Sequence, residues 1–412
     1  MTTVASTQRA RWVRRALSVA LLAAAAAGVD AAPATAARAQ ERGKAAAKAP
    51  PGKIVEGALG KALDEAVRGF DAASGGFCGV VAVASKGKVV LQQGYGIADA
   101  AAGVAMPPDA PFDWASVSKQ FTAALTLRVI ELSVLDDAKR RKACSREVAD
   151  ALKAWKKLSL EDPLSRFFPK APKEKAEVTI RQLLNHTSGI ESGFKGEWQF
   201  DSSRAESLIE LVLGLPMTSK PGTTFDYSNS GYAFVAALLE KLTGVTFEEL
   251  LREQLFEPAG MKEAWQIGEA ALPLARVPKI ERGAGFTDRP ADYKFAYGNQ
   301  LRWGYRGCGG VVATTAAMVQ WDRALRDGKY LSKASLEELY RPAQKDYALG
   351  WEVRNVRGSR RAEHSGGVQG VVAYCLRDLD RDFVVALICS YSPKDHPSVL
   401  ADALAKLVEG AK

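Results

Sequence analysis

The sequence predicts an α/β fold of two lobes: an antiparallel sheet built from both ends of the chain and flanked by helices, with a mostly helical lobe inserted between those ends. Alternating apolar patterns typical of strands occur within residues 77–97 and again within residues 347–390. Helical patterns dominate between Ser116 and Tyr330. A cleft is expected where the lobes meet, with Ser116 at its floor because it begins the first helix after the N-terminal strands.

The N-terminal half of the predicted sheet consists of two strands with one helix packed on them. Ile54–Phe70 carries apolar residues at helical spacing and predicts an amphipathic helix. Phe77–Ala84 and Lys88–Ile97 predict strands joined by the turn Ser85–Gly87. Residues 98–113 contain three prolines and predict an irregular connection to the Ser116 helix.

The remaining elements follow from the same periodicities. Apolar positions recurring every three or four residues predict helices at Thr179–Asn185, Ser203–Leu213, Gly231–Thr243, Phe247–Leu255 and Thr314–Arg326. Later segments predict three strands and a final helix, at Tyr347–Val353, Gly370–Leu376, Phe383–Ser390 and Pro397–Val408. Residues 136–157 form a densely charged insertion, for which a solvated helical segment is favoured over a docking patch for an acidic partner.

The N-terminus predicts export. Arginines precede the uncharged run Ala16–Val29, and small residues that suit cleavage follow, so residues 1–39 are expected to be a signal peptide. Residues 40–53 are expected to be a disordered linker, and residues 54–412 a single folded domain. We therefore expect a periplasmic or secreted protein without a stable membrane anchor after processing.

Charge and metal-ligand content exclude some function classes. Nine Lys and Arg residues but only Asp30 and Glu41 lie within residues 1–53, so +7 of the net charge of +9 falls there and about +2 remains for the domain. A nucleic-acid partner is therefore not expected. With three histidines and no paired cysteine motif, neither a metal site nor a cofactor is predicted.

Ser116 and Lys119 are the candidate nucleophile and its base. Residues three apart on a helix are neighbours, so the Lys119 amine should lie beside the Ser116 hydroxyl. Free N–H groups at a helix start stabilise the negative charge that develops during attack on a carbonyl. A helix cap with a surface lysine explains the same pattern equally well. A second match, Ser85 and Lys88, lies at the predicted turn.

Two further motifs carry polar groups suited to the same site. Tyr227 can act as a base because a nearby ammonium favours the charged form of a phenol, and Asn229 offers a donor and an acceptor to a substrate amide. His364 and Gly366 precede a predicted strand, where glycine allows a substrate to approach closely and a backbone N–H can bind an oxyanion. The alternatives are a helix cap with a packed tyrosine and a structural histidine.

In this order, Ser-x-x-Lys, Tyr-x-Asn and His-x-Gly resemble the motifs of the serine β-lactamase and penicillin-binding protein superfamily, and most closely its class C β-lactamase-like branch. The likeness extends to four longer stretches, Gly79–Gly96, Leu183–Ile190, Pro221–Tyr232 and Gly309–Thr314. The resemblance implies that Ser116 is acylated, that Lys119 and Tyr227 share the proton transfers and that Asn229 holds the substrate. It also implies an oxyanion hole made by the N–H groups of Ser116 and Gly367.

The resemblance further implies an exported serine hydrolase that cleaves an ester, a peptide or amide of D-amino acid type, or a β-lactam through an acyl-enzyme. The alternative is a penicillin-binding-type sensor or cell-wall peptide binder that is acylated without turnover. Because His364 stands where the family often has lysine, esters and neutral amides are favoured over carboxylate-bearing substrates. The expected partner is a small-molecule or peptide substrate, with cell-wall peptides as one source. Cys78 and Cys389 should lie close together on the first and last strands, as buried residues rather than a disulfide.

Overall fold

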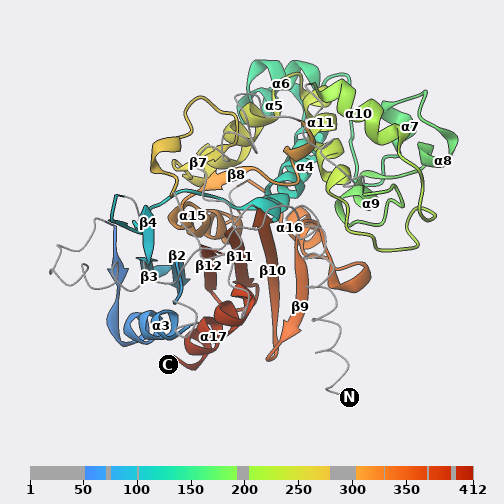
Figure 1. Ribbon diagram of the computed structural model, residues 1–412. Helices are drawn as coiled ribbons and strands as arrows, with labels where there is room; N and C mark the ends of the chain where they lie inside the picture. The colour runs from blue at the N-terminus through green and yellow to red at the C-terminus, as the bar shows by residue number, and fades with distance from the viewer. Residues whose placement is uncertain are drawn as a thin grey trace. The chain divides into compact units, whose positions relative to one another are not determined.

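In the computed structural model, a seven-stranded antiparallel sheet joins strands from residues 54–95 to strands from residues 352–390 (Figure 1). The structure describes residues 52–70, 76–99, 102–192, 204–278, 303–328, 330–368, 371–390 and 396–411. The strand order is β1-β3-β2-β12-β11-β10-β9, and each neighbouring pair is antiparallel. The strands are β1 (Ile54–Val55), β2 (Gly79–Ser85), β3 (Lys88–Tyr95), β9 (Glu352–Val356), β10 (Ser359–Val368), β11 (Val371–Asp378) and β12 (Phe383–Ser390).

The pairing of β2 with β12 confirms the predicted fold class, because it joins the N-terminal strands to the C-terminal ones. Ala82 lies opposite Ala386 in this pair, and Gly79 lies opposite Cys389. Val and Ile residues on both strands are almost wholly buried, as expected for central strands covered on both faces.

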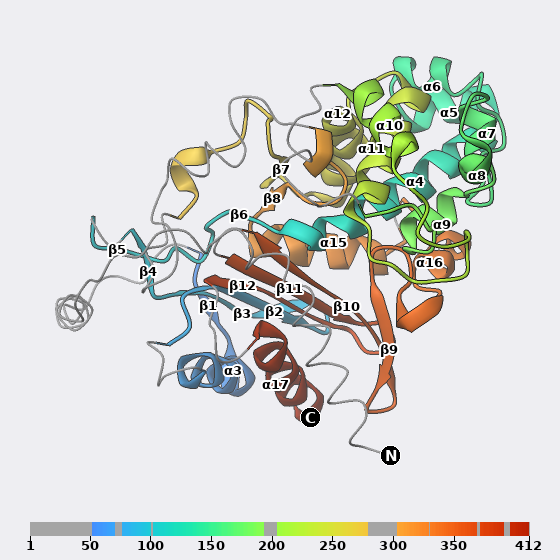
Figure 2. The same ribbon diagram turned by 45° about the vertical axis from the view of Figure 1, so that its right-hand side comes forward.

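Two terminal helices cover one face of the sheet. These are α3 (Gly57–Gly69) and α17 (Pro397–Gly410), which lie side by side below the strands in Figure 2. Their apolar residues share a core with the facing strand residues, and the helix members that are 0% exposed are Leu63, Val67, Ala401, Leu404 and Ala405. Burying such side chains contributes roughly 1.5–3 kcal/mol for each large one.

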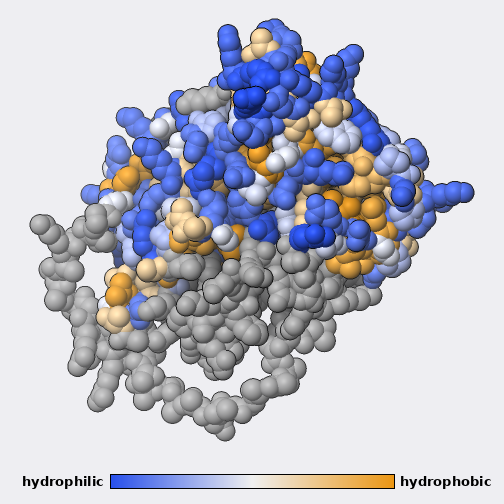
Figure 3. Space-filling model, turned by 90° about the horizontal axis from the view of Figure 1, so that it is seen from above, coloured by the Kyte–Doolittle hydropathy of each residue, from blue (hydrophilic) through white to orange (hydrophobic). Residues whose placement is uncertain are grey.

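The opposite face of the sheet carries α15 (Thr315–Arg326) and the helical lobe (Figure 2). At the centre of this lobe, α4 (Lys119–Val134) packs against α11 (Asn229–Thr243), and both are buried around most of their circumference. The shorter helices are α5 (Asp137–Ala143), α6 (Arg146–Ala151), α7 (Leu164–Phe167), α8 (Lys173–Ala176), α9 (Ile180–Leu184), α10 (Ala205–Gly214), α12 (Phe247–Leu251), α13 (Glu257–Ala259) and α16 (Lys333–Leu339). The outer surface seen in Figure 3 is mainly hydrophilic, with smaller hydrophobic areas between.

Side-chain caps fix the helix ends that the sequence predicted. Thr179 and Thr246 each form a capping box with the residue three positions on, at the starts of α9 and α12. Gly244 ends α11 in the left-handed conformation with φ of 74°. The charged insertion is helical as predicted, and Arg141 bridges Asp137 and Asp150 on its exposed surface.

Two small β-structures were not predicted. β4 (Ile97–Asp99) pairs with β5 (Val104–Ala105), and β8 (Val311–Ala313) lies between β6 (Phe112–Asp113) and β7 (Ala264–Gln266). Each strand is two or three residues long, which is too short for an alternating pattern to stand out. The second sheet carries the chain to Ser116, since β6 ends three residues before it.

The predicted helix Ile54–Phe70 was wrong at its start. Ile54 and Val55 form β1, which pairs with Gln92 and Leu91 of β3. The two β-branched residues favour an extended backbone, and pairing satisfies the edge of β3. The helix begins only at Gly57.

The C-terminal strands also differ from the prediction. The strand predicted at Tyr347–Val353 instead runs over Glu352–Val356, because a turn with Gly350 at φ of 74° interrupts the segment. The ten-residue strand β10 was missed, and its polar sequence with two glycines shows no alternating apolar pattern. His364 therefore lies within a strand rather than before one.

The predicted signal peptide and nearly all of the predicted linker lie outside the described residues. Among the residues that the structure does describe, no helix is both long and apolar enough to cross a membrane.

The arrangement of the cysteines gives a first testable prediction. All five are reduced thiols in the structure, and Cys78 adjoins the residue that lies opposite Cys389. We expect protein unfolded in guanidinium without reductant to titrate with five reactive thiols. A count of three, unchanged when oxygen is excluded during purification, would contradict this reduced state and show that one disulfide is present.

Candidate active site

Ser116 lies on a short turn that the neighbouring strands hold in place. It is the second residue of a 3-10 turn, Ala115–Ser118, and α4 begins only at Lys119, not at Ser116 as predicted. Ala115 adopts φ of 45°, and its N–H donates to the Asp113 carboxylate at 2.8 Å. The Tyr305 hydroxyl donates to the other Asp113 oxygen at 2.9 Å. These contacts hold the turn so that Ser116 remains partly exposed.

The Lys119 side chain is buried beneath Ser116 and has a hydrogen-bond acceptor for each of its three protons. Its Nζ lies 3.1 Å from Ser116 Oγ, 2.5 Å from Asn229 Oδ1 and 2.8 Å from the Cys308 carbonyl oxygen. Lys119 is 0% exposed, and this burial lowers its pKa to about 8. A substantial fraction of the amine is therefore neutral in mildly alkaline solution and able to take a proton from Ser116.

Tyr227 completes the group on the helical side. Its side chain hydrogen-bonds with that of Ser116, and its ring faces Lys119 with the centroid 4.8 Å from Nζ. Burial raises the pKa of the phenol above its ordinary value, and the hydrogen bond with Ser116 only partly opposes this. The expectation of a phenolate therefore does not hold, since desolvation by burial is the largest effect on the pKa of Tyr227. Tyr227 keeps its proton at neutral pH.

Strand β10 comes close to the turn Ala115–Ser118 at Gly366. A methyl group at this position would lie 2.5 Å from the Trp114 carbonyl oxygen and 2.9 Å from the Ser116 nitrogen. Glycine is therefore required for sheet and turn to meet. The expected role of Gly366, close approach of a substrate, stays a prediction. Gly367, the next residue, is exposed on the same strand. Its role in an oxyanion hole with Ser116 stays a prediction.

His364 is buried against the helical side, at 4% exposure. Its Nδ1 lies 2.5 Å from the Ser365 carbonyl oxygen and must donate to it, so Nε2 accepts from the Tyr347 hydroxyl at 3.0 Å. Burial, together with the charge of Lys119, lowers the pKa of His364 to about 3. The ring is neutral as predicted, but both nitrogens are engaged by the protein. Direct substrate binding by His364 stays a prediction.

The structure thus brings Ser116, Lys119, Tyr227 and Asn229 together, with β10 alongside. Sequence reasoning missed three contributors: the Cys308 carbonyl, Tyr347 and His186. A backbone carbonyl leaves no residue-type signal. Tyr347 was hidden in a predicted strand, whereas the Leu183–Ile190 stretch that contains His186 resembled the family and could have been given a role.

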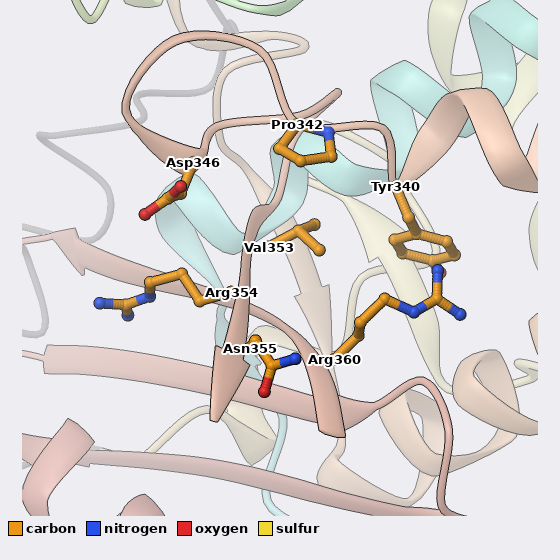
Figure 4. Close-up of a pocket in the computed structure, with 7 residues that line it drawn as sticks. All are labelled: Tyr340, Pro342, Asp346, Val353, Arg354, Asn355 and Arg360. Carbon is orange, nitrogen blue, oxygen red and sulfur yellow. The ribbon is translucent and has the colours of Figure 1, made fainter. Parts of the chain in front are cut away.

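A surface pocket of about 430 Å³ lies elsewhere, between the loop after α16 and strand β9 (Figure 4). None of its lining residues belongs to the group around Ser116. Its two arginines are already engaged, Arg354 with Glu363 and Arg360 with Asp380. These ion pairs stabilise the sheet edge and leave the pocket without a free cation.

An antiparallel sheet beside a helical lobe, with a serine above a buried lysine at their junction, defines the serine hydrolases of the β-lactamase and transpeptidase-like superfamily. Residues 63–409 match the family model described as Beta-lactamase. This match covers more than half of the chain, and the chain belongs to that family.

Curated relatives and solved structures agree with this assignment. The chain is 31% identical over 307 residues to a D-aminopeptidase from Brucella anthropi, covering 71% of this chain and 52% of the relative. It is 27% identical over 325 residues to penicillin-binding protein 4* from Bacillus subtilis, covering 74% and 66%. The chain therefore spans about half the length of the first relative and just under two thirds of the second.

The fold also matches a crystal structure of D-amino acid amidase from Ochrobactrum anthropi SV3 complexed with L-phenylalanine amide. The TM-score is 0.64 at 23% identity, with 84% of this chain and 97% of that chain covered. At this level of identity the match supports the fold alone.

The contact at Gly366 predicts a large effect from one methyl group. In Gly366→Ala, the turn or the strand must shift, and we expect the rate of Ser116 acylation by a p-nitrophenyl ester to fall about 10²-fold. Gly214→Ala is the control, because a methyl group there meets nothing within 4 Å. An unchanged acylation rate in Gly366→Ala would show that the close approach does not set the nucleophile geometry.

Proposed function

We propose that the chain is an exported serine hydrolase of the class C-like branch that cleaves amide or peptide bonds of D-amino acid type through an acyl-enzyme on Ser116. The observation that carries this proposal is the 3.1 Å contact between Ser116 Oγ and a Lys119 amine whose pKa is lowered to about 8. A buried amine of this kind is a general base, not a surface charge. Residues 1–39 would direct the chain to the periplasm or out of the cell.

In the acylation step, neutral Lys119 takes the Ser116 proton as Oγ bonds to the substrate carbonyl carbon. The Ser116 and Gly367 N–H groups receive the negative charge that forms on the carbonyl oxygen. The Tyr227 phenol hydrogen-bonds with Ser116 and gives its proton to the departing amine nitrogen, while Lys119 returns a proton to Tyr227. The carbon–nitrogen bond breaks, and an ester on Ser116 remains.

Hydrolysis of that ester requires an activated water. The sequence has no Glu-x-x-Leu-Asn loop of the class A type, so the same Lys119–Tyr227 pair would take the water proton as the oxygen attacks the ester carbonyl. Ser116 Oγ then leaves with a proton from the pair, which restores the free enzyme. The two groups act as one coupled system with shared apparent pKa values.

The choice of substrate class rests on two observations. The relative at 31% identity is named a D-aminopeptidase, which favours D-amino acid amides and peptides. In addition, His364 is buried and neutral, so this position supplies no cation for a substrate carboxylate. Substrates with a neutral group at that side, such as amides and esters, are therefore favoured over those with a free carboxylate.

A second candidate function is a penicillin-binding-type sensor that is acylated without turnover. The similarity to penicillin-binding protein 4* favours it, because that relative is named for binding penicillin. Both candidates share the nucleophile and differ only in the rate of deacylation.

The two candidate functions can be separated by incubating the mature protein with four kinds of compound. These are D- and L-alanine p-nitroanilide, a p-nitrophenyl ester, a chromogenic cephalosporin and a fluorescent penicillin. We expect sustained release from the D-anilide or the ester, and an adduct on Ser116 in the intact mass under fast quenching. Ser116→Ala should lose both, by at least about 10³-fold in rate. Stoichiometric, stable labelling without release would favour the sensor, and full hydrolysis by Ser116→Ala would exclude the proposed nucleophile.

The lowered pKa of Lys119 predicts the pH dependence of acylation. The neutral amine is the reactive form, so kcat/KM should rise about tenfold per pH unit below the apparent pKa and level off above about pH 9. The midpoint should lie at about 8, as set by burial of Lys119. Lys119→Met should lose most of the activity, and the remaining activity should no longer rise with pH around 8. A profile that is flat through this range would contradict Lys119 as the base.

A further inference from the structure

His186 holds the residues on both sides of Tyr227. Its carbonyl oxygen accepts a hydrogen bond from the Asp226 N–H at 2.8 Å, and its ring Nδ1 accepts one from the Ser228 N–H at 3.0 Å. Tyr227 is therefore the one residue between two backbone anchors that a single histidine supplies. His186 is 1% exposed and lies outside the reach of solvent.

The imidazole also packs directly on the phenol ring. The two ring centroids are 4.2 Å apart at an angle of 40°, and the Tyr347 and Tyr232 rings contact the same imidazole at 4.6 and 5.1 Å. This packing fixes the plane of Tyr227, whereas the two hydrogen bonds fix its backbone. Together they determine where the phenol oxygen lies relative to Ser116.

The protonation state of His186 suits this role. Because Nδ1 accepts a hydrogen bond, the ring proton is on Nε2, which has no hydrogen-bond partner among the described residues. Burial and the charge of Lys119 hold the pKa of His186 well below its ordinary value. The ring therefore remains a neutral acceptor and does not exchange protons during a reaction cycle.

The backbone at this position restricts which residues can replace histidine. His186 has φ of 61°, in the left-handed region where Asn, Asp and His are several-fold enriched among non-glycine residues. An acceptor must also lie where Nδ1 lies, two bonds beyond Cβ. Asparagine meets both requirements, because its Oδ1 occupies the equivalent position.

We propose that His186 is a positioning residue for the reaction at Ser116, acting through Tyr227 and without contact with the substrate. The proposal rests on the proposed function, in which the Tyr227 phenol transfers protons at Ser116. Loss of the Nδ1 acceptor would leave the Ser228 N–H buried and unpaired, so the loop would move to satisfy it. A displacement of about 1 Å at a catalytic group lowers the rate about 10²-fold.

The test compares His186→Leu, His186→Asn and His186→Gln, with initial rates measured on the p-nitrophenyl ester. We expect kcat to fall about 10²-fold in the leucine variant with little change in KM, because a positioning effect acts on the chemical step. Asparagine should restore most of the rate, whereas glutamine, whose acceptor lies one bond further out, should not. If His186→Leu does not fold, the comparison of His186→Asn with His186→Gln still tests whether the acceptor position matters.

His396→Leu is the matched control. Its Nδ1 also accepts a backbone N–H, from Ser398 at 3.2 Å, but at the start of α17 on the other side of the sheet. His396 is only partly buried. We expect this variant to lower the melting temperature without lowering kcat, which would separate the stability cost of losing a histidine acceptor from an effect on the reaction.

A double-mutant cycle with Tyr227→Phe tests whether His186 acts through the phenol. His186→Leu should lower kcat by less than about threefold in the Tyr227→Phe background, since the group that it positions is already absent. Equal losses in both backgrounds, or equal rates for asparagine and glutamine, would overturn the inference. Full activity of Tyr227→Phe alone would instead overturn the role of Tyr227 in the proposed function.

Discussion

The burial of the Lys119 ammonium is the constraint on which the rest of the site depends. An unpaired charge in the protein interior is costly, so the fold must bring acceptors to it. They come from three segments far apart in the chain: the turn that carries Ser116, the start of α11 at Asn229, and the loop before β8 at Cys308. The three acceptors do not fully offset the desolvation of Lys119, so burial still favours the neutral amine. The packing of the helical lobe thereby controls how readily Lys119 accepts a proton.

The sheet contributes to the same site by close contact, not by charge. β10 meets the turn Ala115–Ser118 at Gly366, which has no side chain to keep them apart. Gly350 allows a second close contact, with the start of α4. A methyl group at Gly350 would lie 2.7 Å from the Lys119 carbonyl oxygen. Both glycines remove the volume that would hold sheet and helix apart. The aromatic residues around His186 then fill the space on the helical side.

Much of the fold could be predicted from the sequence, because its elements have strong periodicities and identifiable caps. The helices α9, α11 and α15 were placed within a few residues, since Thr179, Gly244 and Thr314 mark their ends. β10 was not found, because its stability comes from pairing on both edges, with β9 and β11, and not from an apolar pattern of its own.

The site was predictable in its residue types but not in its electrostatics. The spacing of Ser116 and Lys119 and the order of the later motifs identified the four side chains that meet. The sequence could not show that burial raises the pKa of Tyr227, or that both nitrogens of His364 have protein partners. Such effects depend on how deeply a group is buried, and burial is a property of the assembled chain.

The pairing of β2 with β12 has a consequence for biogenesis. The centre of the sheet cannot form until β12 has been synthesised, although β2 is made much earlier. Contacts between such distant segments make folding slow and leave strand edges unpaired in the nascent chain. A polypeptide of this topology therefore keeps the edge of β2 open until β12 has been synthesised.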